Sequence, residues 1–428
     1  MNFSAHISDL VNLPGTIFQW LAMEIGGFSI FALRLPAVIL TLLAAALLIW
    51  TVVKWSRASI AIISGFAIVA STLFVGLTHA GTNAALMIFW LAVMIFFATQ
   101  VLLSSRGSWR TTIYKIALCI AGSLLIYSPG GIYFAIILAL VALIHPKSRL
   151  LFLRLKLWKI LVGIFIGLII VSPLILGVIL QAKDGEFGLL RELLMLTGQF
   201  SFANLQSLAT AFVAVRVGFA GGFILPVLSI ASVMIAVLGL VKVAKDIFSA
   251  RSYLTLSLLL LSLILSALNP AMLGLLIVPL TLLLSVGFLA LVEFWYRFFP
   301  RNPFARTLAA VMLVVLVVSA GWLDIMRSFT MENYSAQVVY NYNREFAAVR
   351  TEILRNKSEA VTLVVPSSQQ DFYGILVREF PKLTIATNAK NPVGKLMILD
   401  SAKVKPNKIP TKIVTNSLSR NSVLMRVY

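Results

Sequence analysis

Long apolar runs separated by short polar connections occupy the first three quarters of the chain. A run of about 20 apolar residues can cross a bilayer as a helix, and in lipid each backbone amide must be satisfied inside the segment. The pattern therefore predicts an all-α, polytopic membrane bundle of about ten spans. These spans are expected at 36–54, 60–78, 84–104, 111–128, 130–145, 157–180, 224–242, 253–268, 270–292 and 306–324.

Two other apolar stretches are interrupted by polar residues. Residues 13–31 are rich in aromatic side chains but contain Glu24 and a glycine pair, and residues 181–223 carry scattered charges. This amphipathic composition is typical of helices that lie at the membrane interface. We expect residues 1–35 to form an outer-face segment, with a further span inside 13–31 as the alternative.

After residue 326 the pattern becomes that of a small α/β domain. Apolar residues recur at helical spacing from Tyr342 to Ile353, which indicates a helix with one buried stripe. No glycine-rich phosphate loop follows the first expected strand, so nucleotide binding is unsupported. Strands are expected at 361–366, 383–387, 395–400, 411–415 and 423–428, and a second helix at 367–380. The predicted domains are therefore 1–35, 36–325 and 326–428.

Composition supports the membrane class. The chain has 428 residues, of which 60% are hydrophobic and 12% charged, whereas soluble domains carry about 25% charged residues. Its one cysteine, Cys119, excludes a disulfide within the chain and a cysteine-cluster metal site. The net charge of +20 indicates membrane orientation and contact with anionic membrane lipid rather than nucleic acid.

The distribution of basic residues predicts the orientation. All but four of the Lys and Arg residues up to position 325 lie in every second connection, and the opposite short loops at 78–83, 128–131 and 267–271 have none. Cytoplasmic loops carry this excess of positive charge. We therefore expect an integral protein of the plasma or inner membrane, with the 326–428 domain on the extracytoplasmic side. The four exceptions are Arg34, Lys183, Arg191 and Arg216.

The segment that leads into the first span carries a family pattern. Leu13-Pro14 is followed by Phe18, Trp20, Gly27-Phe28-Ser29 and then Phe31-Ala32-Leu33-Arg34-Leu35-Pro36. This pattern resembles the polyprenyl-phosphate-sugar transferases of the GT-C fold, which include protein O-mannosyltransferases and aminoarabinose transferases of lipid A. The resemblance is specific in sequence over roughly residues 12–105 and extends in layout over most of the chain.

The resemblance implies a reaction. Members of the family move a sugar from a lipid phosphate in the outer leaflet to an acceptor, by inverting displacement at the anomeric carbon. Basic groups hold the departing phosphate, an acid takes the acceptor's proton, and a divalent cation assists in some members. The expected partner is a lipid-linked sugar donor, and the expected setting is cell-envelope glycan or glycoprotein assembly.

The chain also departs from the family. The family's first span and the acidic pair after it have no counterpart before Leu13. "THAGTN" (78–83) replaces a motif with a basic residue and an aspartate, and "NPAMLG" (269–274) replaces an Arg-Tyr pair. These departures leave two explanations open. The chain is either an N-terminally short fragment with a diverged remainder, or a non-catalytic GT-C-like scaffold or lipid-binding partner protein of an envelope assembly complex. A transporter is disfavoured because the sequence shows no inverted repeat and no paired broken spans.

Two arginines are the candidates for binding the lipid phosphate. Arg216 stands alone in an apolar segment just before a span, where an ionisable group suggests a functional site. Arg34 lies at the predicted outer end of the first span. The alternatives are an interface anchor for Arg216 and, for Arg34, a structural arginine that ties the outer helix to the first span.

The remaining candidates are acids and loop residues on the predicted outer side. Asp9 and Glu24 are the candidate catalytic acids, although neither matches a family motif, and solvated loop charges are the alternative. His79 and Asn83 are candidates for lining the substrate cavity, with ordinary polar loop residues as the alternative. No metal-ligand cluster is recognisable, and a divalent cation is expected only through the family resemblance.

Overall fold

The chain divides into two compact units in the computed structural model. The helical unit comprises the chain up to Trp20 together with Arg34–Met326, and the sheet unit comprises Leu21–Leu33 together with Arg327–Tyr428. The structure describes residues 10–27, 29–79, 82–104, 109–146, 149, 157–183, 185, 187–195, 200–213, 217–335, 338, 345–356, 359–374, 376–389, 392, 394–404, 409–416 and 419–428.

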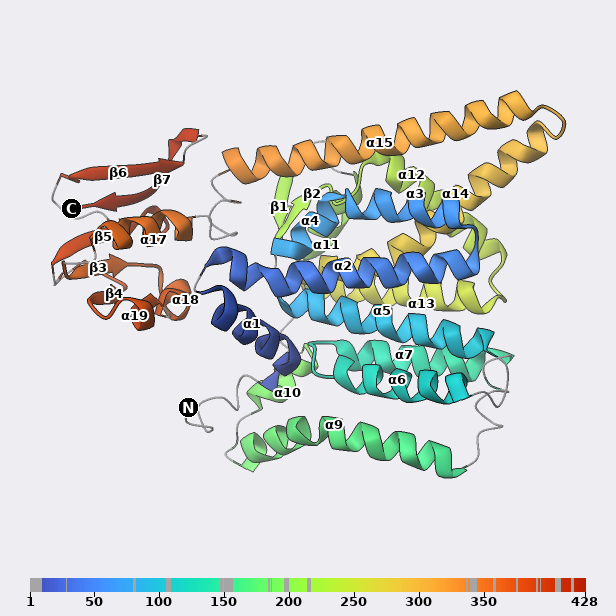
Figure 1. The fold of residues 1–428 in the computed structure, drawn as a ribbon, viewed down its shortest axis with the longest axis horizontal. Coiled ribbons are helices and arrows are strands. Elements are labelled where there is room, and N and C mark those ends of the chain that lie inside the picture. The colour runs from blue at the N-terminus through green and yellow to red at the C-terminus, as the bar shows by residue number, and fades with distance from the viewer. Residues whose placement is uncertain are drawn as a thin grey trace. The chain divides into compact units, whose positions relative to one another are not determined.

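Long helices that run side by side build the helical unit (Figure 1). A helix occupies each position where a span is expected, but within the described residues six helices are long and apolar enough to cross a membrane, or seven if the bent pair α3 and α4 counts as one span. The predicted count of ten is therefore not confirmed. The helices are α1 (Leu13–Gly26), α2 (Ile30–Trp55), α3 (Ala58–Val69), α4 (Thr72–His79), α5 (Thr82–Leu103), α6 (Trp109–Leu125), α7 (Gly131–Ile144), α9 (Leu157–Lys183), α10 (Gly188–Leu193), α11 (Phe202–Val213), α12 (Ile230–Lys245), α13 (Ala250–Leu268), the 3-10 helix η2 (Pro270–Leu276), α14 (Ile277–Phe298) and α15 (Pro303–Tyr334).

The second expected span is broken. Helices α3 and α4 meet at an angle of 58°. Two carbonyls from a distant segment satisfy the first turn of α4, because Thr72 Oγ1 donates to Pro226 O at 2.6 Å and Leu73 N donates to Val227 O at 3.1 Å. Lipid offers no partner for such backbone groups, so a break at membrane depth needs protein acceptors and donors around it.

A β-hairpin supplies the segment that satisfies α4. Strands β1 (Gly218–Ala220) and β2 (Phe223–Leu225) pair antiparallel through a turn at Gly221 and Gly222, whose φ angles are +57° and +90°. Two successive positive φ values are typical of tight hairpin turns and favour glycine. The expected span at 224–242 is therefore wrong at its start: residues 223–225 form a strand, and α12 begins at Ile230 behind the N-cap Ser229.

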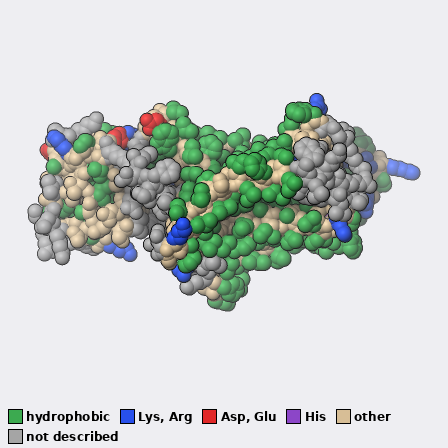
Figure 2. Space-filling model, turned by 90° about the horizontal axis from the view of Figure 1, so that it is seen from below, with side chains coloured by type: hydrophobic (Ala, Val, Ile, Leu, Met, Phe, Trp, Pro, Cys, Tyr) green, Lys and Arg blue, Asp and Glu red, His purple; other side chains and the backbone are tan. Residues whose placement is uncertain are grey.

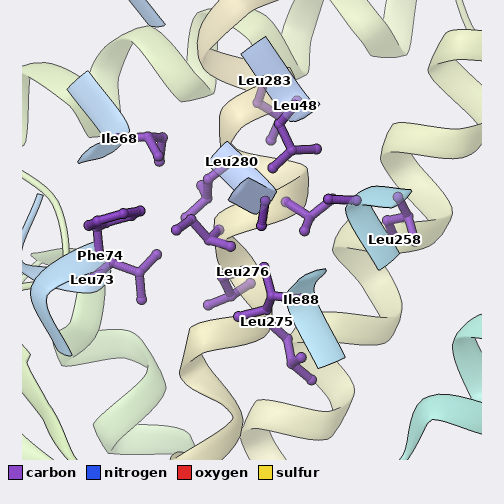
Figure 3. Packing of buried hydrophobic residues seen from close by; sticks show 14 of the residues in the cluster. Leu48, Ile68, Leu73, Phe74, Ile88, Leu258, Leu275, Leu276, Leu280 and Leu283 are labelled. Atoms are coloured by element: carbon purple, nitrogen blue, oxygen red, sulfur yellow. The ribbon is translucent and has the colours of Figure 1, made fainter. Parts of the chain in front are cut away.

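Helix α14 lies at the centre of the apolar core. Figure 3 shows Leu280 and Leu283 of α14 among side chains from the surrounding helices, including Leu48, Ile68 and Leu258. Glycines allow close backbone contact between α12 and α14: a Cβ atom on Gly239 would lie 2.0 Å from Leu283 O. Small residues at helix contacts serve the same purpose throughout membrane bundles.

The surface of the helical unit is apolar as well. Helix α9 exposes Leu161, Phe165, Leu168 and Leu176, and Figure 2 shows hydrophobic side chains spread broadly over one face of the molecule. Apolar patches of this extent do not face water in monomeric proteins. Together with the long apolar helices, this surface identifies an integral membrane protein.

The sheet unit confirms the expected small α/β domain. Its sheet has the order β4-β3-β5-β7-β6, in which β3 is parallel to β4 and β5, and β7 is antiparallel to β5 and β6. Its elements are α17 (Glu345–Arg355), β3 (Val361–Val364), η3 (Ser367–Gln369), α18 (Gln370–Gly374), α19 (Leu376–Glu379), β4 (Leu383–Ala386), β5 (Lys395–Leu399), η4 (Asp400–Ala402), β6 (Lys412–Asn416) and β7 (Ser419–Val427).

The predicted stripe on α17 is buried. Phe346, Val349 and Ile353 pack with Tyr373 and Leu376 against one face of the sheet. The stripe's first residue, Tyr342, lies outside the described residues. The helix expected at 367–380 begins as the 3-10 helix η3 and continues as α18 and α19 on either side of Ile375, which lies outside the described residues.

The hairpin turn provides a test of the packing in the helical unit. A Cβ atom on Gly221 would lie 2.2 Å from the carbonyl carbon and oxygen of Pro270, whereas on Gly218 it would meet Leu225 at an ordinary 4.0 Å. We expect Gly221→Ala to lower the free energy of unfolding by roughly 2 kcal/mol or more, because strain at positive φ adds to the clash. Thermal unfolding of the detergent-purified chain measures this, with Gly218→Ala as the matched control. Equal midpoints for the two variants would contradict the close approach.

Candidate functional site

The end of the helical unit that the charge distribution predicts to face outward is called the rim here. It consists of α2 from Arg34 to Ala37, the end of α4, the start of α5, residues 128–131, the β1–β2 hairpin and η2. The hairpin turn approaches η2 closely at Gly221, and Gly76 of α4 and Gly274 of η2 both face Phe223 of the hairpin. Elements far apart in sequence therefore meet in one layer.

Hydrogen bonds attach the connecting helices α10 and α11 to the rim. Gly130 N donates to Leu193 O at 2.9 Å, and Tyr133 Oη donates to Leu194 O at 2.8 Å. Asn204 Nδ2 of α11 donates to Leu268 O, at the end of α13, at 3.2 Å. These bonds satisfy backbone carbonyls where helices end. The long segment between α9 and α12 is thus held against the helix ends.

Arg34 lies half-buried in the first turns of α2. The helix begins at Ile30, six residues before the expected span, and continues through Pro36. Directly after the proline, Ala37 packs with Ala85 and Leu86 of α5. Arg34 is therefore placed at the rim, close in sequence to the contact between α2 and α5, a position compatible with either of its predicted roles.

His79 is the last residue of α4 and is half-buried. Its Nδ1 atom lies 2.9 Å from Val75 O and 3.2 Å from Thr78 Oγ1. This ring nitrogen is thus engaged by the end of its own helix. Asn83 lies in the first turn of α5, but its side chain is outside the described part of the structure. Their predicted role in a cavity stays a prediction.

The other predicted site residues are only partly placed. Glu24 is exposed near the end of α1, in the part of that helix that belongs to the sheet unit. Asp9 and Arg216 lie outside the described residues, and Arg216 directly precedes Val217 and strand β1 in sequence. The catalytic and lipid-phosphate roles of these residues therefore stay predictions.

Asp324 is a buried acid near the rim that sequence reasoning missed. It is 1% exposed in α15, and its Oδ2 atom accepts a hydrogen bond from Ser229 N at 3.1 Å. The side chain of Ser229 in turn caps α12 by accepting from Ser232 N. A carboxylate at a helix N-terminus is favoured by the helix dipole. A lone acid in the apolar stretch "VVSAGWLDIM" was the available signal.

The described residues do not fit a metal site. Within the ranges given above, no three His, Cys, Asp or Glu side chains are close enough together to hold an ion. The divalent cation suggested by the family resemblance therefore has no ligand set among them, and no reaction step is assigned to it.

The sheet unit contains one strongly perturbed acid. Glu345, at the start of α17, is 3% exposed. Burial raises its pKa to about 7; a hydrogen bond from Ser401 Oγ at 3.3 Å opposes this shift, and the nearby Asp400 charge adds to it. Asp400 itself pairs with Arg426 at 2.8 Å. Perturbed acids of this kind occur at functional sites and in structural networks alike.

The apolar helices and the small sheet define a class of protein, an integral membrane protein with a small C-terminal α/β domain. Residues 14–176 match the family model described as dolichyl-phosphate-mannose-protein mannosyltransferase. This match confirms the resemblance inferred from the segment around Arg34. No curated protein matches the sequence.

Two solved structures share the fold along nearly the whole chain. The chain is similar to ArnT from Cupriavidus metallidurans bound to undecaprenyl phosphate, with 13% identity, a TM-score of 0.54, and coverage of 96% of this chain and 86% of that chain. It is also similar to the apo state of the same protein, with 12% identity, a TM-score of 0.52 and the same coverage. At this identity the likeness concerns the fold.

Asp324 can be tested through stability. Replacing it with alanine leaves Ser229 N–H without this buried acceptor, whereas asparagine retains an acceptor oxygen. An unsatisfied buried donor costs about 1–3 kcal/mol. Thermal or denaturant unfolding in detergent should therefore show the wild type as the most stable, Asp324→Asn as intermediate and Asp324→Ala as the least stable. An alanine variant as stable as wild type would show that the contact does not hold α12 in place.

Glu345 predicts a pH dependence of stability. The folded chain keeps the Glu345 proton up to about pH 7, while the unfolded chain loses it near the ordinary value of 4.5. Stability from this group is therefore greatest below pH 4.5 and falls by roughly 3 kcal/mol as the pH rises to 7. Unfolding measured from pH 4.5 to 8 should show this slope in wild type and a flatter profile in Glu345→Gln. The same slope in both would contradict the assignment.

Proposed function

We propose that this protein is a membrane glycosyltransferase that takes a sugar from a polyprenyl phosphate. The observation that carries the proposal is the family match over residues 14–176, the part of the chain that contains Arg34, His79 and Asn83. The ArnT-like fold over 96% of the chain supports it, because that structure holds undecaprenyl phosphate. The sugar would pass to an acceptor in cell-envelope glycan or glycoprotein assembly.

In this proposal, the lipid phosphate binds to the two candidate arginines, Arg34 and Arg216. A guanidinium group matches a phosphate through paired hydrogen bonds and stays charged at every physiological pH. Arg34 is half-buried at the rim, where water screens a charge less than in bulk solvent. Arg216 precedes strand β1, whose hairpin is part of the same rim. Both charges would stabilise the phosphate as the sugar leaves.

The proton of the acceptor would be taken by an outer acid. Asp9 and Glu24 are the proposed candidates, and the exposure of Glu24 leaves its carboxylate accessible to an acceptor from solvent. A carboxylate that accepts this proton raises the nucleophilicity of the acceptor oxygen as it attacks the anomeric carbon. Displacement from the face opposite the phosphate would invert that carbon.

A specific observation favours the second candidate, a non-catalytic GT-C-like protein that binds the lipid or a partner protein. The rim segments at 78–83 and 269–274 are uncharged. Asp324, an acid that lies near the rim, accepts a hydrogen bond from Ser229 N–H. Such a protein would bind the lipid phosphate without cleaving the sugar bond.

The proposed orientation places the sheet unit on the extracytoplasmic side of the plasma or inner membrane. The support is the distribution of Lys and Arg, which are absent from the short loops at 78–83, 128–131 and 267–271. The same orientation would bring the rim to the leaflet in which the family's lipid donors are expected.

The arginines can be tested by lipid binding. Detergent-purified chain is titrated with undecaprenyl phosphate, and we expect Arg34→Ala and Arg216→Ala each to weaken binding by about tenfold, the loss of one charge-assisted contact. Arg57→Ala is the control, because Arg57 is an exposed arginine at the start of α3, at the opposite end. Equal loss in all three variants would indicate nonspecific charge attraction.

Transfer distinguishes the two functions. Membranes containing the protein receive a radiolabelled polyprenyl-phosphate sugar, with and without EDTA to test the divalent cation. Release of label that depends on Arg216 supports the enzyme, whereas arginine-dependent binding without release supports the scaffold. Absence of both binding and release would overturn the lipid-phosphate site itself.

A further inference from the structure

A groove separates α17 from the edge strand β6 in the sheet unit. Its volume is about 470 Å³. One wall is helix α17 and the other is β6, and we call it the α17–β6 groove. It is lined by Ala347, Ala348, Thr351, Glu352, Arg355, Lys412, Ile413, Val414 and Thr415. The side chains of Ala347 and Ala348 are small, so the helix wall leaves room for a side chain from outside.

The strand wall presents unpaired backbone groups. Among the described strands, β6 pairs with β7 and stands at the edge of the sheet. Leu396 of β5 and Tyr428, the residue after β7, exchange both backbone hydrogen bonds. Val427, the last residue of β7, therefore directs its backbone groups the other way, toward its β6 partner Lys412. Successive residues alternate in direction in an antiparallel pair. The N–H and C=O of Ile413 therefore point away from β7, toward the open edge.

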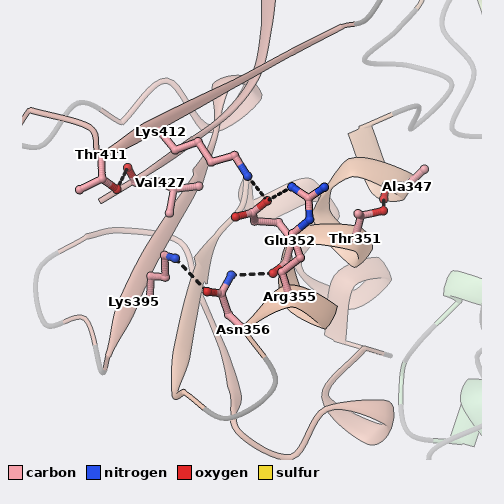
Figure 4. Close-up of polar contacts among 9 residues, drawn as sticks. All are labelled: Ala347, Thr351, Glu352, Arg355, Asn356, Lys395, Thr411, Lys412 and Val427. Carbon is pink, nitrogen blue, oxygen red and sulfur yellow. Dashed lines mark hydrogen bonds and ion pairs between the residues drawn. The ribbon is translucent and has the colours of Figure 1, made fainter.

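The groove is basic at one end. Glu352 is the acid there, and it is already paired with Lys412 and, at 3.5 Å, with Arg355 (Figure 4). Burial opposes its ionisation, but the Lys412 hydrogen bond and the surrounding cations lower the pKa of Glu352 overall. One buried carboxylate thus faces two cations, and Lys395 adds a third charge nearby through Asn356.

The two cations retain exposed surface beyond this pair. The side chain of Arg355 is 65% exposed and that of Lys412 is 42% exposed. The sequence from 403 to 412 that leads into β6 contains four lysines and no acid. A groove with excess positive charge at one end and unpaired strand groups along one wall matches an extended segment with a carboxylate.

We propose that the α17–β6 groove binds an extended acidic peptide segment of another protein. The segment would lie against β6, exchange backbone hydrogen bonds with Ile413, and place a carboxylate beside Arg355 and Lys412. A register shift in β6 after Val414 limits regular pairing to the first half of the strand. The bound segment is therefore short, and its recognition depends on charge as well as on the backbone. This inference is independent of the reaction proposed for the helical unit.

Peptide binding to the full chain in detergent tests the proposal. The probes are two pools of fluorescein-labelled hexapeptides with Val, Thr or Ile at every position except the third, which is Glu in one pool and Lys in the other. Fluorescence anisotropy should show the Glu pool binding at least about tenfold more tightly than the Lys pool. N-methylation of alternate peptide nitrogens should remove binding, because it removes the donors that face the strand.

Two variants and a control locate the site. Ala347→Trp fills the groove from an exposed position, and Arg355→Gln removes the more exposed cation; each should weaken binding of the Glu pool by about tenfold. Lys382→Gln, just before the opposite edge strand β4, should leave binding unchanged.

Three results would overturn the proposal. The first is no binding of the Glu pool up to about 1 mM, and the second is equal affinity for both pools. The third is self-association of the protein, detected by detergent-corrected light scattering and abolished by Ala347→Trp, because the occupant would then be a second copy of the chain.

Discussion

Backbone hydrogen bonds at the break between α3 and α4 are the constraint on which the helical unit depends. Water cannot satisfy a helix end at membrane depth, so protein groups must do so. Pro226 and Val227 supply carbonyls to α4, and the same segment continues to Ser229, whose N–H is bound by Asp324 of α15. Three helices and a hairpin are therefore joined at one place, and the rim is built on that junction.

This arrangement relates the fold to the proposed chemistry. Polar side chains at the junction are engaged in structural hydrogen bonds: Asp324 accepts from Ser229 N–H, and the Thr72 hydroxyl donates to Pro226 O. Charges available for a lipid phosphate must come from the segments that lead into the rim, where Arg34 and Arg216 occur. The rim has its polar groups hydrogen-bonded within the protein, and its charged residues lie in the segments that lead into it. Such an arrangement suits the recognition of a lipid headgroup at the membrane surface.

Two glutamates of the sheet unit, Glu345 and Glu352, differ in pKa because their surroundings differ. Glu345 and Glu352 lie two helical turns apart on α17, and both are buried. Burial raises the pKa of Glu345, and the neighbouring carboxylate adds to this shift while one hydroxyl donor opposes it. Burial also opposes the ionisation of Glu352, but the Lys412 hydrogen bond and the charges of Lys412 and Arg355 lower its pKa overall. Burial disfavours both charges, and for Glu352 the cationic partners reverse the outcome. The first residue is suited to titrate near neutral pH, and the second to anchor a cationic groove.

The sequence by itself determined the membrane class, the approximate places of most helices and of the strands of the sheet unit, and the GT-C resemblance, because apolar length, periodicity and the pattern around Arg34 are local properties. It also placed Arg34 at the outer end of a helix, whereas His79, expected in a loop, is the last residue of α4; the roles of both remain predictions. Only the tertiary structure decided the break before Thr72, the hairpin at 218–225, the bond from Ser229 to Asp324 and the partners of the α17 glutamates. The bonds at the break, at Asp324 and at Glu352 join residues distant in sequence, and the hairpin is positioned by its packing against α4 and η2, so no local pattern encodes them.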